Sequence, residues 1–256
     1  MTGPDTRPSA GSEPQSPDGA ADAPVDRVLV VTAHPDDIDF GASGTVAAWV
    51  DAGTAVAYCI VTSGDAGGFD DTPRQEMRAL REAEQRAAAD AVGVTDVTFL
   101  GYPDGQLYVT HELRRDITRQ IRRFRPQRVL TQSPERNWQR IAPSHPDHLA
   151  AGEAALCAVY PDARNPFAHP DLLAEEGLAA WTAPEVWMMG GPNVNHYMDV
   201  TATFDRKLAA LRAHRSQTGH LSDLEGMLRS WHGANAAAAG LAEGRLAEAF
   251  QVISTA

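Results

Sequence analysis

The chain is poor in cysteine and in positive charge, and it lacks a long apolar run. Its two cysteines, Cys59 and Cys157, stand among apolar residues, so we interpret them as small core residues and not as disulfide partners. The formal net charge of −12 argues against nucleic-acid and anionic membrane partners, which favour a basic face. No segment resembles a secretory signal or reaches the ~20 apolar residues of a membrane span. We therefore expect a cytoplasmic protein.

Composition divides the chain into two parts. Residues 1–26 are rich in Pro, Gly, Ser and Asp and contain no apolar run, so they cannot offset the entropy lost on ordering. They are predicted to form a disordered acidic leader. Residues 27–256 are long enough to bury a sizeable core and are predicted to form one domain.

Apolar runs alternate with segments of helical periodicity along the second part. Strands are predicted over 28–31, 55–62, 97–100, 128–131 and 185–189, and helices over 41–52, 73–92, 113–124, 148–160, 205–214 and 234–250. Regular alternation of this kind favours an α/β fold in which helices flank a mostly parallel sheet.

The segment after the first strand carries chemistry, because ligands of open α/β sheets bind at the carboxyl ends of the strands. The sequence there is Ala33-His34-Pro35-Asp36-Asp37. A dinucleotide-binding protein would have G-x-G-x-x-G at this place, whereas this chain supplies an imidazole and two carboxylates. A cofactor enzyme of that type is therefore disfavoured, and a divalent metal site is predicted.

The motif returns as His145-Pro146-Asp147-His148, again after an apolar run and before a helix. Proline favours an extended residue before it and a helical turn after it, so the first and fourth positions of each tetrad can face one point. Taking His34, Asp37 and His148 as ligands gives two nitrogens and a carboxylate, a set known for catalytic zinc. His145 and Asp147 then remain to act on a substrate.

Two neighbouring features are interpreted separately. A third H-P-D, starting at His169, has Leu172 in the fourth position and follows no strand, so it is interpreted as a surface loop. Trp138 stands in a polar loop before the second tetrad. It is a candidate to stack on a sugar ring, with a partly buried structural role as the alternative.

The two tetrads together resemble the PIG-L (LmbE-like) deacetylases. The likeness runs from about residue 27 to 220 and includes Arg81-Glu82-Ala83-Glu84, the turn Gly101-Tyr102-Pro103-Asp104-Gly105, and Asp199-Val200-Thr201. It implies a Rossmann-like fold, a single zinc ion, and hydrolysis of N-acetyl groups, commonly on N-acetylglucosamine attached to another moiety.

The resemblance also implies roles for individual residues. His34, Asp37 and His148 match the metal ligands, Asp36 the general base, and His145 the group that stabilises the oxyanion or protonates the leaving amine, with Asp147 orienting His145. Positions that contact the sugar in mycothiol-type members correspond to Arg81, Asp104 and Gln217, and Asp65 lies near an acidic loop position. Those members carry two adjacent acids in that loop, whereas Asp65 is followed by Ala66.

The expected activity is zinc-dependent removal of an acetyl group from an N-acetylated small molecule, foremost an N-acetylglucosaminyl conjugate, by metal-activated water. One zinc per chain is expected, although other divalent ions suit the same donors. One alternative is an amidase of the same fold that cleaves a larger acyl or thiol-conjugate amide. Another is a non-catalytic, metal-stabilised glycoside-binding protein, which would leave Asp36 and His145 without a purpose. The partner is then a small glycoside, and the oligomeric state stays open.

Overall fold

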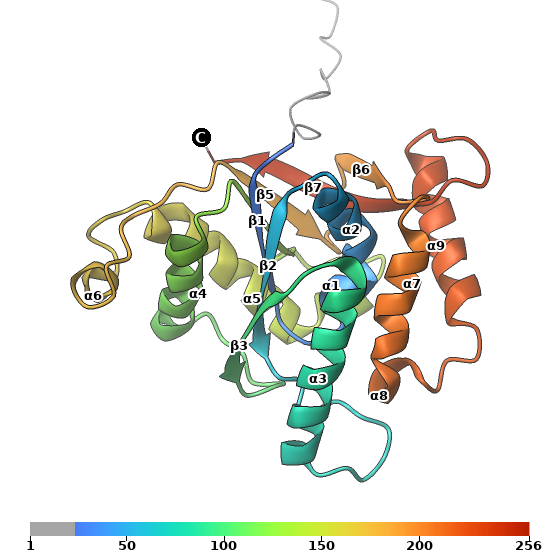
Figure 1. Cartoon of the computed structure of the whole chain (residues 1–256), viewed down its shortest axis with the longest axis horizontal. Helices are drawn as coiled ribbons and strands as arrows, with labels where there is room; N and C mark the ends of the chain where they lie inside the picture. The colour runs from blue at the N-terminus through green and yellow to red at the C-terminus, as the bar shows by residue number, and fades with distance from the viewer. Residues whose placement is uncertain (1–23, 256) are drawn as a thin grey trace, which may run out of the picture.

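The computed structural model describes residues 24–255 (Figure 1). All but the last three residues of the predicted leader lie outside this range. Within it, Val25 already belongs to the domain, since it packs against the core and its carbonyl accepts a hydrogen bond of 2.7 Å from Thr54 Oγ1.

Seven strands of the described chain form one sheet in the order β3-β2-β1-β4-β5-β7-β6. Their bounds are β1 Arg27–Thr32, β2 Ala55–Thr62, β3 Asp96–Tyr102, β4 Arg128–Gln132, β5 Glu185–Met189, β6 His196–Asp199 and β7 Ala247–Ser254. The five predicted strands are confirmed as β1 to β5, and they pair in parallel, with Val28 opposite Val56 and Arg128. The α/β prediction of a mostly parallel sheet is thereby confirmed.

Helices connect these strands. Their bounds are α1 Asp37–Gly41, α2 Ser43–Asp51, α3 Arg74–Val92, α4 His111–Phe124, α5 Pro146–Cys157, α6 Pro170–Ala174, α7 Phe204–Ala213, α8 Arg215–Thr218 and α9 Leu224–Ala238, with short turns η1 Ala142–Ser144 and η2 Ala158–Ala163. Two expectations are corrected. Cys157 at the end of α5 is partly exposed, while Cys59 is buried as expected. His169 is buried at the start of α6, against Asp162, and does not lie in a surface loop.

The predicted helix 234–250 is also wrong in its second half. The helix α9 ends at Ala238, and residues 247–254 form β7, which lies antiparallel between β5 and β6. Gly240 and Gly244 separate the two elements with φ of 72° and 83°. These positive φ values favour glycine and do not occur inside a helix, so the chain leaves the helix here.

Alternate residues of β1 bury two separate layers. Val28 and Val30 face α2, α3 and α7, while Leu29 and Val31 face α4 and α5. Because side chains of a strand alternate between its faces, a continuous apolar strand fits a sheet covered on both sides. Figure 1 shows α4 and α5 on one side of the sheet and α1, α2, α3 and α7 on the other.

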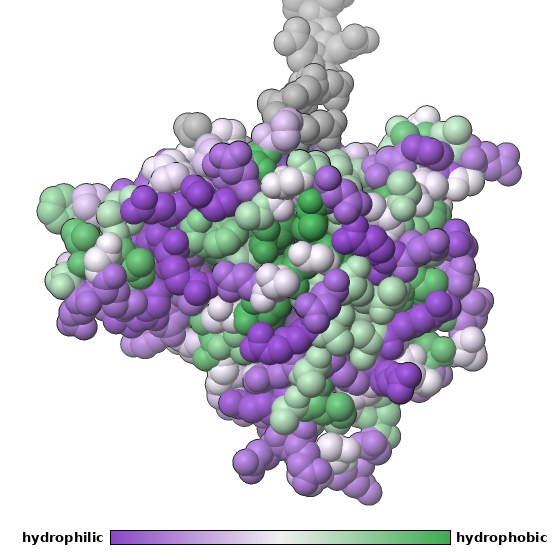
Figure 2. Space-filling model, viewed as in Figure 1, coloured by the Kyte–Doolittle hydropathy of each residue, from purple (hydrophilic) through white to green (hydrophobic). Residues whose placement is uncertain are grey.

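A third, smaller cluster joins α7 to α9, with Phe204, Leu208 and Leu228 among its buried members. On the face shown in Figure 2, hydrophilic side chains lie over α3, α4 and α9. This distribution agrees with helices whose apolar sides are directed inward. In the described part of the chain, no helix has the length and apolar character needed to cross a membrane.

Candidate functional site

Both tetrads lie at the carboxyl edge of the sheet because β1 and β4 are parallel neighbours. The first follows β1, where the Ala33 N–H donates to the Gln132 side chain at 2.9 Å and so links the two strand ends. The second starts α5, with His145 as the N-cap and Pro146 in the first turn. A Cβ on Gly152 would lie 2.3 Å from the Gln132 carbonyl oxygen, so glycine permits α5 to approach β4 this closely.

The three predicted ligands converge. His34 Nδ1 lies 3.3 Å from His148 Nε2, and Asp37 places one carboxylate oxygen 3.0 Å from His148 Nε2 and the other 3.4 Å from His34 Nδ1. Ligand atoms around a tetrahedral zinc ion, at about 2.0–2.2 Å from it, are separated by roughly 3.3 Å. The donor set and its spacing therefore fit a divalent ion.

The opposite edge of each imidazole is occupied, and this fixes the tautomer. His34 Nε2 donates to Asp104 at 3.1 Å and to Asp147 at 3.2 Å, and His148 Nδ1 donates to the Pro143 carbonyl at 3.1 Å. The other nitrogen of each ring faces Asp37, and it would offer its lone pair to a bound cation. Metal-ligating histidines typically donate their second N–H to a carboxylate or carbonyl in this way.

Charge at this point is strongly negative. Burial disfavours the charged form of His34, but the carboxylates of Asp37, Asp104 and Asp147 outweigh it and raise its pKa to about 12. Burial likewise opposes the charge of His148, and Asp37 raises its pKa nonetheless. In Asp37, burial is overcome by the two histidines, which lower its pKa well below the ordinary value. A cation would replace the protons held by these rings.

His145 lies beside the two histidines predicted as ligands, and ring nitrogens of His34, His145 and His148 fall within 4.8 Å of one another. Its Nδ1 accepts a hydrogen bond of 3.3 Å from the Asp147 N–H, so its proton is carried on Nε2. Burial, followed by the charges of His34 and His148, lowers the pKa of His145. The ring is therefore a neutral N–H donor at the site.

Asp147 differs from expectation. Its carboxylate contacts His34 and accepts the N–H groups of Gly105 at 2.7 Å and Leu107 at 3.2 Å. Only its backbone N–H reaches His145. The predicted orientation of His145 by this residue thus comes from the main chain, while the carboxylate holds His34.

Asp36 contacts Arg81 and not the three residues predicted as ligands. Its backbone has φ of 85°, a conformation that is strained for a residue other than glycine and is typical of functional sites. Arg81 donates to the Asp36 carboxylate at 3.1 Å, and the side chain of Asp36 remains 15% exposed. Burial raises the pKa of Asp36 to about 6, against the lowering effect of Arg81. A carboxylate with a raised pKa is a suitable proton acceptor near neutral pH.

Arg81 is buried, and its guanidinium donates hydrogen bonds to the protein itself. Besides Asp36 it donates to the carbonyls of Pro35 at 2.7 Å and Gly64 at 2.9 Å. A Cβ on Gly64 would lie 2.3 Å from the guanidinium, which explains a glycine at this point of the loop after β2. Arg81 therefore fixes the base candidate and the loop together.

The other predicted sugar contacts, except Trp138, gather with Arg81 around the loop after β2. The Asp104 N–H donates to Asp65 Oδ1 at 3.2 Å, and the Ala66 N–H donates to Asp104 Oδ2 at 3.0 Å. Asp104 is directed at His34, Asp65 pairs with Arg74 at 3.0 Å, and Gln217 lies near the Gly67 backbone. Trp138 is 81% exposed and packs under Arg136, outside the cleft described next.

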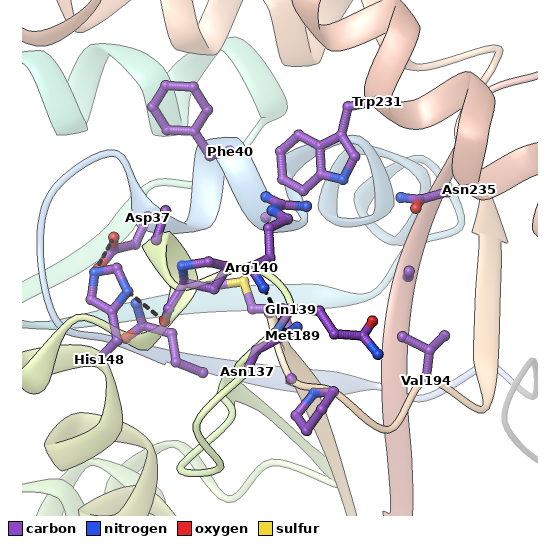
Figure 3. A pocket seen from close by; sticks show the side chains of 18 of the residues that line it. Asp37, Phe40, Asn137, Gln139, Arg140, His148, Met189, Val194, Trp231 and Asn235 are labelled. Atoms are coloured by element: carbon purple, nitrogen blue, oxygen red, sulfur yellow. Dashed lines mark hydrogen bonds and ion pairs between the residues drawn. The ribbon is translucent and has the colours of Figure 1, made fainter.

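A cleft of about 880 Å³ extends from Asp37 and His148 toward α9 (Figure 3). Its far part is lined by Arg140, Trp231 and Asn235, among others. None of these three residues was predicted from the sequence, because the loop that carries Arg140 and the helix α9 contain no motif. A tryptophan and an amide on one helix face, four positions apart, were the available signal.

Comparison with known proteins gives one consistent result. The family described as PIG-L, GlcNAc-PI de-N-acetylase, matches residues 29–159. The chain is 32% identical to a diacetylchitobiose deacetylase of Thermococcus kodakarensis, over 75% of this chain and 70% of that protein. It is 33% identical to a probable N-acetyl-α-D-glucosaminyl L-malate deacetylase 2 of Bacillus cereus, over 80% and 87% respectively. Among solved structures, the N,N'-diacetylchitobiose deacetylase of Pyrococcus horikoshii matches with a TM-score of 0.80 and 29% identity, covering 90% of this chain and 84% of that one.

Proposed function

Since the chain belongs to the PIG-L family of de-N-acetylases, we propose that it is a zinc-dependent enzyme that removes the acetyl group from an N-acetylglucosaminyl conjugate. The observation that carries this proposal is the convergence of His34, Asp37 and His148 beside two groups, Asp36 and His145, that are not needed to hold an ion. A purely structural metal site would leave both without a role.

Bound zinc would be held by His34, Asp37 and His148 and would supply Lewis acidity, which polarises an amide carbonyl and makes a water molecule more acidic. Asp36 accepts the proton of the attacking water at its carboxylate, which Arg81 keeps in place. The Nε2–H of neutral His145 donates to the oxygen on which negative charge develops.

The carbon–nitrogen bond then breaks, with acetate and a free amine as products. The proton gained by Asp36 is available to the departing amine. Asp36 and His145 can therefore complete one cycle without a further acid. His34 keeps its orientation through Asp104 and Asp147 during this cycle.

The test is an assay of the zinc-loaded protein with N-acetylglucosaminides and matched N-butyryl and N-benzoyl analogues. Release of acetate and amine in equal amounts, with much slower release of the larger acids, is expected. Faster cleavage of the larger acyl groups would support the amidase alternative. Binding of the glycosides without any release would support a binding protein.

A further inference from the structure

Two side chains of α3 contact the proposed base, Asp36. Arg81 donates to the Asp36 carboxylate at 3.1 Å, and Gln85 Oε1 accepts a hydrogen bond of 2.8 Å from the Asp36 backbone N–H. Arg81 and Gln85 are four positions apart, so they lie on one face of the helix. Both are buried, and Gln85 has no exposed surface. The backbone of Asp36 is therefore bound by a residue that was not among the predicted site residues.

The backbone conformation of Asp36 explains why such a partner is needed. Its φ of 85° is rare for residues other than glycine and persists only where the surroundings fix it. The peptide group that joins Pro35 to Asp36 is bound at both ends, because Arg81 donates to the Pro35 carbonyl at 2.7 Å and Gln85 accepts the N–H. Without Gln85, one end of this peptide group is free, and φ of Asp36 can relax toward ordinary negative values.

The amide of Gln85 is itself fixed by a buried carboxylate. Gln85 Nε2 donates to Asp39 Oδ2 at 2.9 Å, and the same oxygen contacts His214 Nε2 at 2.8 Å. A carboxylate accepts and a backbone N–H donates, so the amide has one orientation, with its oxygen toward Asp36. Asp39 and His214 are fully buried, so water does not compete for these contacts.

The helix α1 is anchored independently of Gln85. Lys207 is fully buried, and its Nζ donates to the carbonyls of Asp39 at 2.8 Å and Phe40 at 2.7 Å. Both carbonyls belong to α1, which begins with Asp37. Removing the amide of Gln85 should therefore leave Asp37 in place. The effect of Gln85 on the base can then be separated from any effect on the metal site.

We propose that Gln85 is a positioning residue for the hydrolysis: by accepting the Asp36 N–H, it keeps the base in the left-handed conformation in which its carboxylate meets Arg81. This inference rests on the proposed function, in which Asp36 takes the proton of the attacking water. Gln85 is buried and does not line the cleft, so it acts through Asp36 and not on the substrate.

The experiment compares the zinc-loaded wild type with Gln85→Met, Gln85→Asn and Gln120→Met, using an N-acetylglucosaminide as the substrate. Methionine keeps the length of the side chain without the amide. Asparagine keeps an amide beside Asp39, but it is one carbon shorter and cannot reach both partners. It carries the test if Gln85→Met does not fold. Gln120 is the control, because it is a buried glutamine on α4, on the other side of the sheet (Figure 1).

We expect kcat to fall by about 10- to 100-fold in both Gln85 variants, since a misplacement of about 1 Å can cost about 10²-fold in rate. KM and zinc content should stay at wild-type values, and Gln120→Met should change neither these nor kcat. Unchanged kcat in the Gln85 variants, loss of their zinc, or a change confined to KM would overturn the proposal.

The same substitutions in the Asp36→Asn background distinguish positioning from a general structural role. They should cause no further fall in kcat, because the group through which Gln85 acts has been removed. The His148→Ala protein provides the background rate. A further fall as large as in the wild-type background would show that Gln85 does not act through Asp36, and would overturn the proposal.

Hydrogen exchange of the Asp36 amide, followed by NMR, tests the contact without turnover. The amide should exchange slowly in the wild type and in Gln120→Met, and about 10-fold faster or more in the Gln85 variants. If this pattern is found but no glycoside releases acetate, the proposed hydrolysis fails and the contact of Gln85 with Asp36 stands. Rapid exchange in the wild type, or equal exchange in all the proteins, would overturn the inference whatever the activity.

Discussion

Asp36 and Asp37 are adjacent in the chain, yet their carboxylates have different partners. Asp37 begins α1 and bridges the ring nitrogens of His34 and His148, whereas Asp36 meets Arg81. The backbone of Asp36 is in the left-handed conformation, with φ of 85°, whereas Asp37 begins the right-handed helix α1. Two identical side chains therefore have different surroundings, and we expect different roles for them.

Replacement of each aspartate by asparagine should therefore have a different effect. Asp37→Asn is expected to weaken zinc binding, with activity partly restored by excess zinc. Asp36→Asn is expected to keep its zinc and lose about 10²- to 10⁴-fold in kcat, with no recovery on adding zinc. Metal analysis after dialysis and steady-state kinetics measure both. The opposite pattern, with zinc lost only in Asp36→Asn, would show that the roles are exchanged.

The true tetrads should also be distinguishable from the third H-P-D. His148→Ala removes one of three proposed ligands and should abolish stoichiometric zinc binding. His169→Ala should retain zinc and turnover, but with a lower melting temperature, because His169 is buried within 3.4 Å of Asp162. Inductively coupled plasma analysis and thermal unfolding test this pair. Loss of zinc in His169→Ala would contradict the ligand assignment.

The contact between Asp147 and His34 leads to a third prediction. Asp147→Asn should reduce zinc affinity by about 10- to 100-fold, as is usual when the partner of a ligating histidine is changed. This follows from the carboxylate of Asp147, which accepts from His34 Nε2 at 3.2 Å. Zinc affinity is measured by competition with a chelator. If kcat alone fell and zinc affinity were unchanged, Asp147 would act on His145 as the sequence suggested.

The sheet and the two tetrads could be predicted from local signals. The first tetrad directly follows the apolar strand β1, and each tetrad contains a proline that starts a turn, so these signals are local. Contacts over long sequence distances could not be predicted. Asp104 reaches His34 only because β3 lies two strands from β1 in the sheet, and the resemblance assigned it to the sugar instead.

The last segment of the chain shows that composition alone does not predict secondary structure. Its alanine-rich segment favoured one long helix, but Gly240 and Gly244 end the helix and β7 completes the sheet. Placing α9 over the cleft depends on this strand, whose Ala247 carbonyl accepts from Asn235 at 3.0 Å. Trp231 was therefore missed, while the more conspicuous Trp138 was selected.

Replacing Trp231 and Trp138 by alanine in turn tests which of them contacts the substrate. Trp231→Ala should raise KM for a glucosaminide with a second moiety by about 10-fold, because stacking and apolar contact are lost in the cleft. Trp138→Ala should leave KM unchanged, since Trp138 is 81% exposed and does not line the cleft. Kinetics with a simple methyl glycoside provides a baseline for both variants. A larger effect of Trp138→Ala would support the prediction, made from sequence, that Trp138 stacks on the sugar.

His232 gives the stability of the fold a dependence on pH. The ring is fully buried on α9, with Nδ1 donating to the Ala247 carbonyl at 3.1 Å. Burial, followed by the charge of Lys207, lowers the pKa of His232 from 6.5 to about 4. Below pH 6.5 the unfolded chain binds a proton that the folded chain does not accept until about pH 4, so the free energy of unfolding falls across this interval.

We expect this contribution to be fully present above pH 6.5 and to decrease as the pH falls to about 4, by at most about 3 kcal/mol. His232→Asn retains a donor for the Ala247 carbonyl but cannot titrate. Urea unfolding between pH 4 and 7 should therefore show a shallower pH dependence in this variant, even if its stability at pH 7 is lower. His220→Asn, at an exposed position, is the control, and the difference from wild type cancels the contribution of the metal site. Equal slopes in wild type and His232→Asn would show that the buried ring is protonated in the folded state.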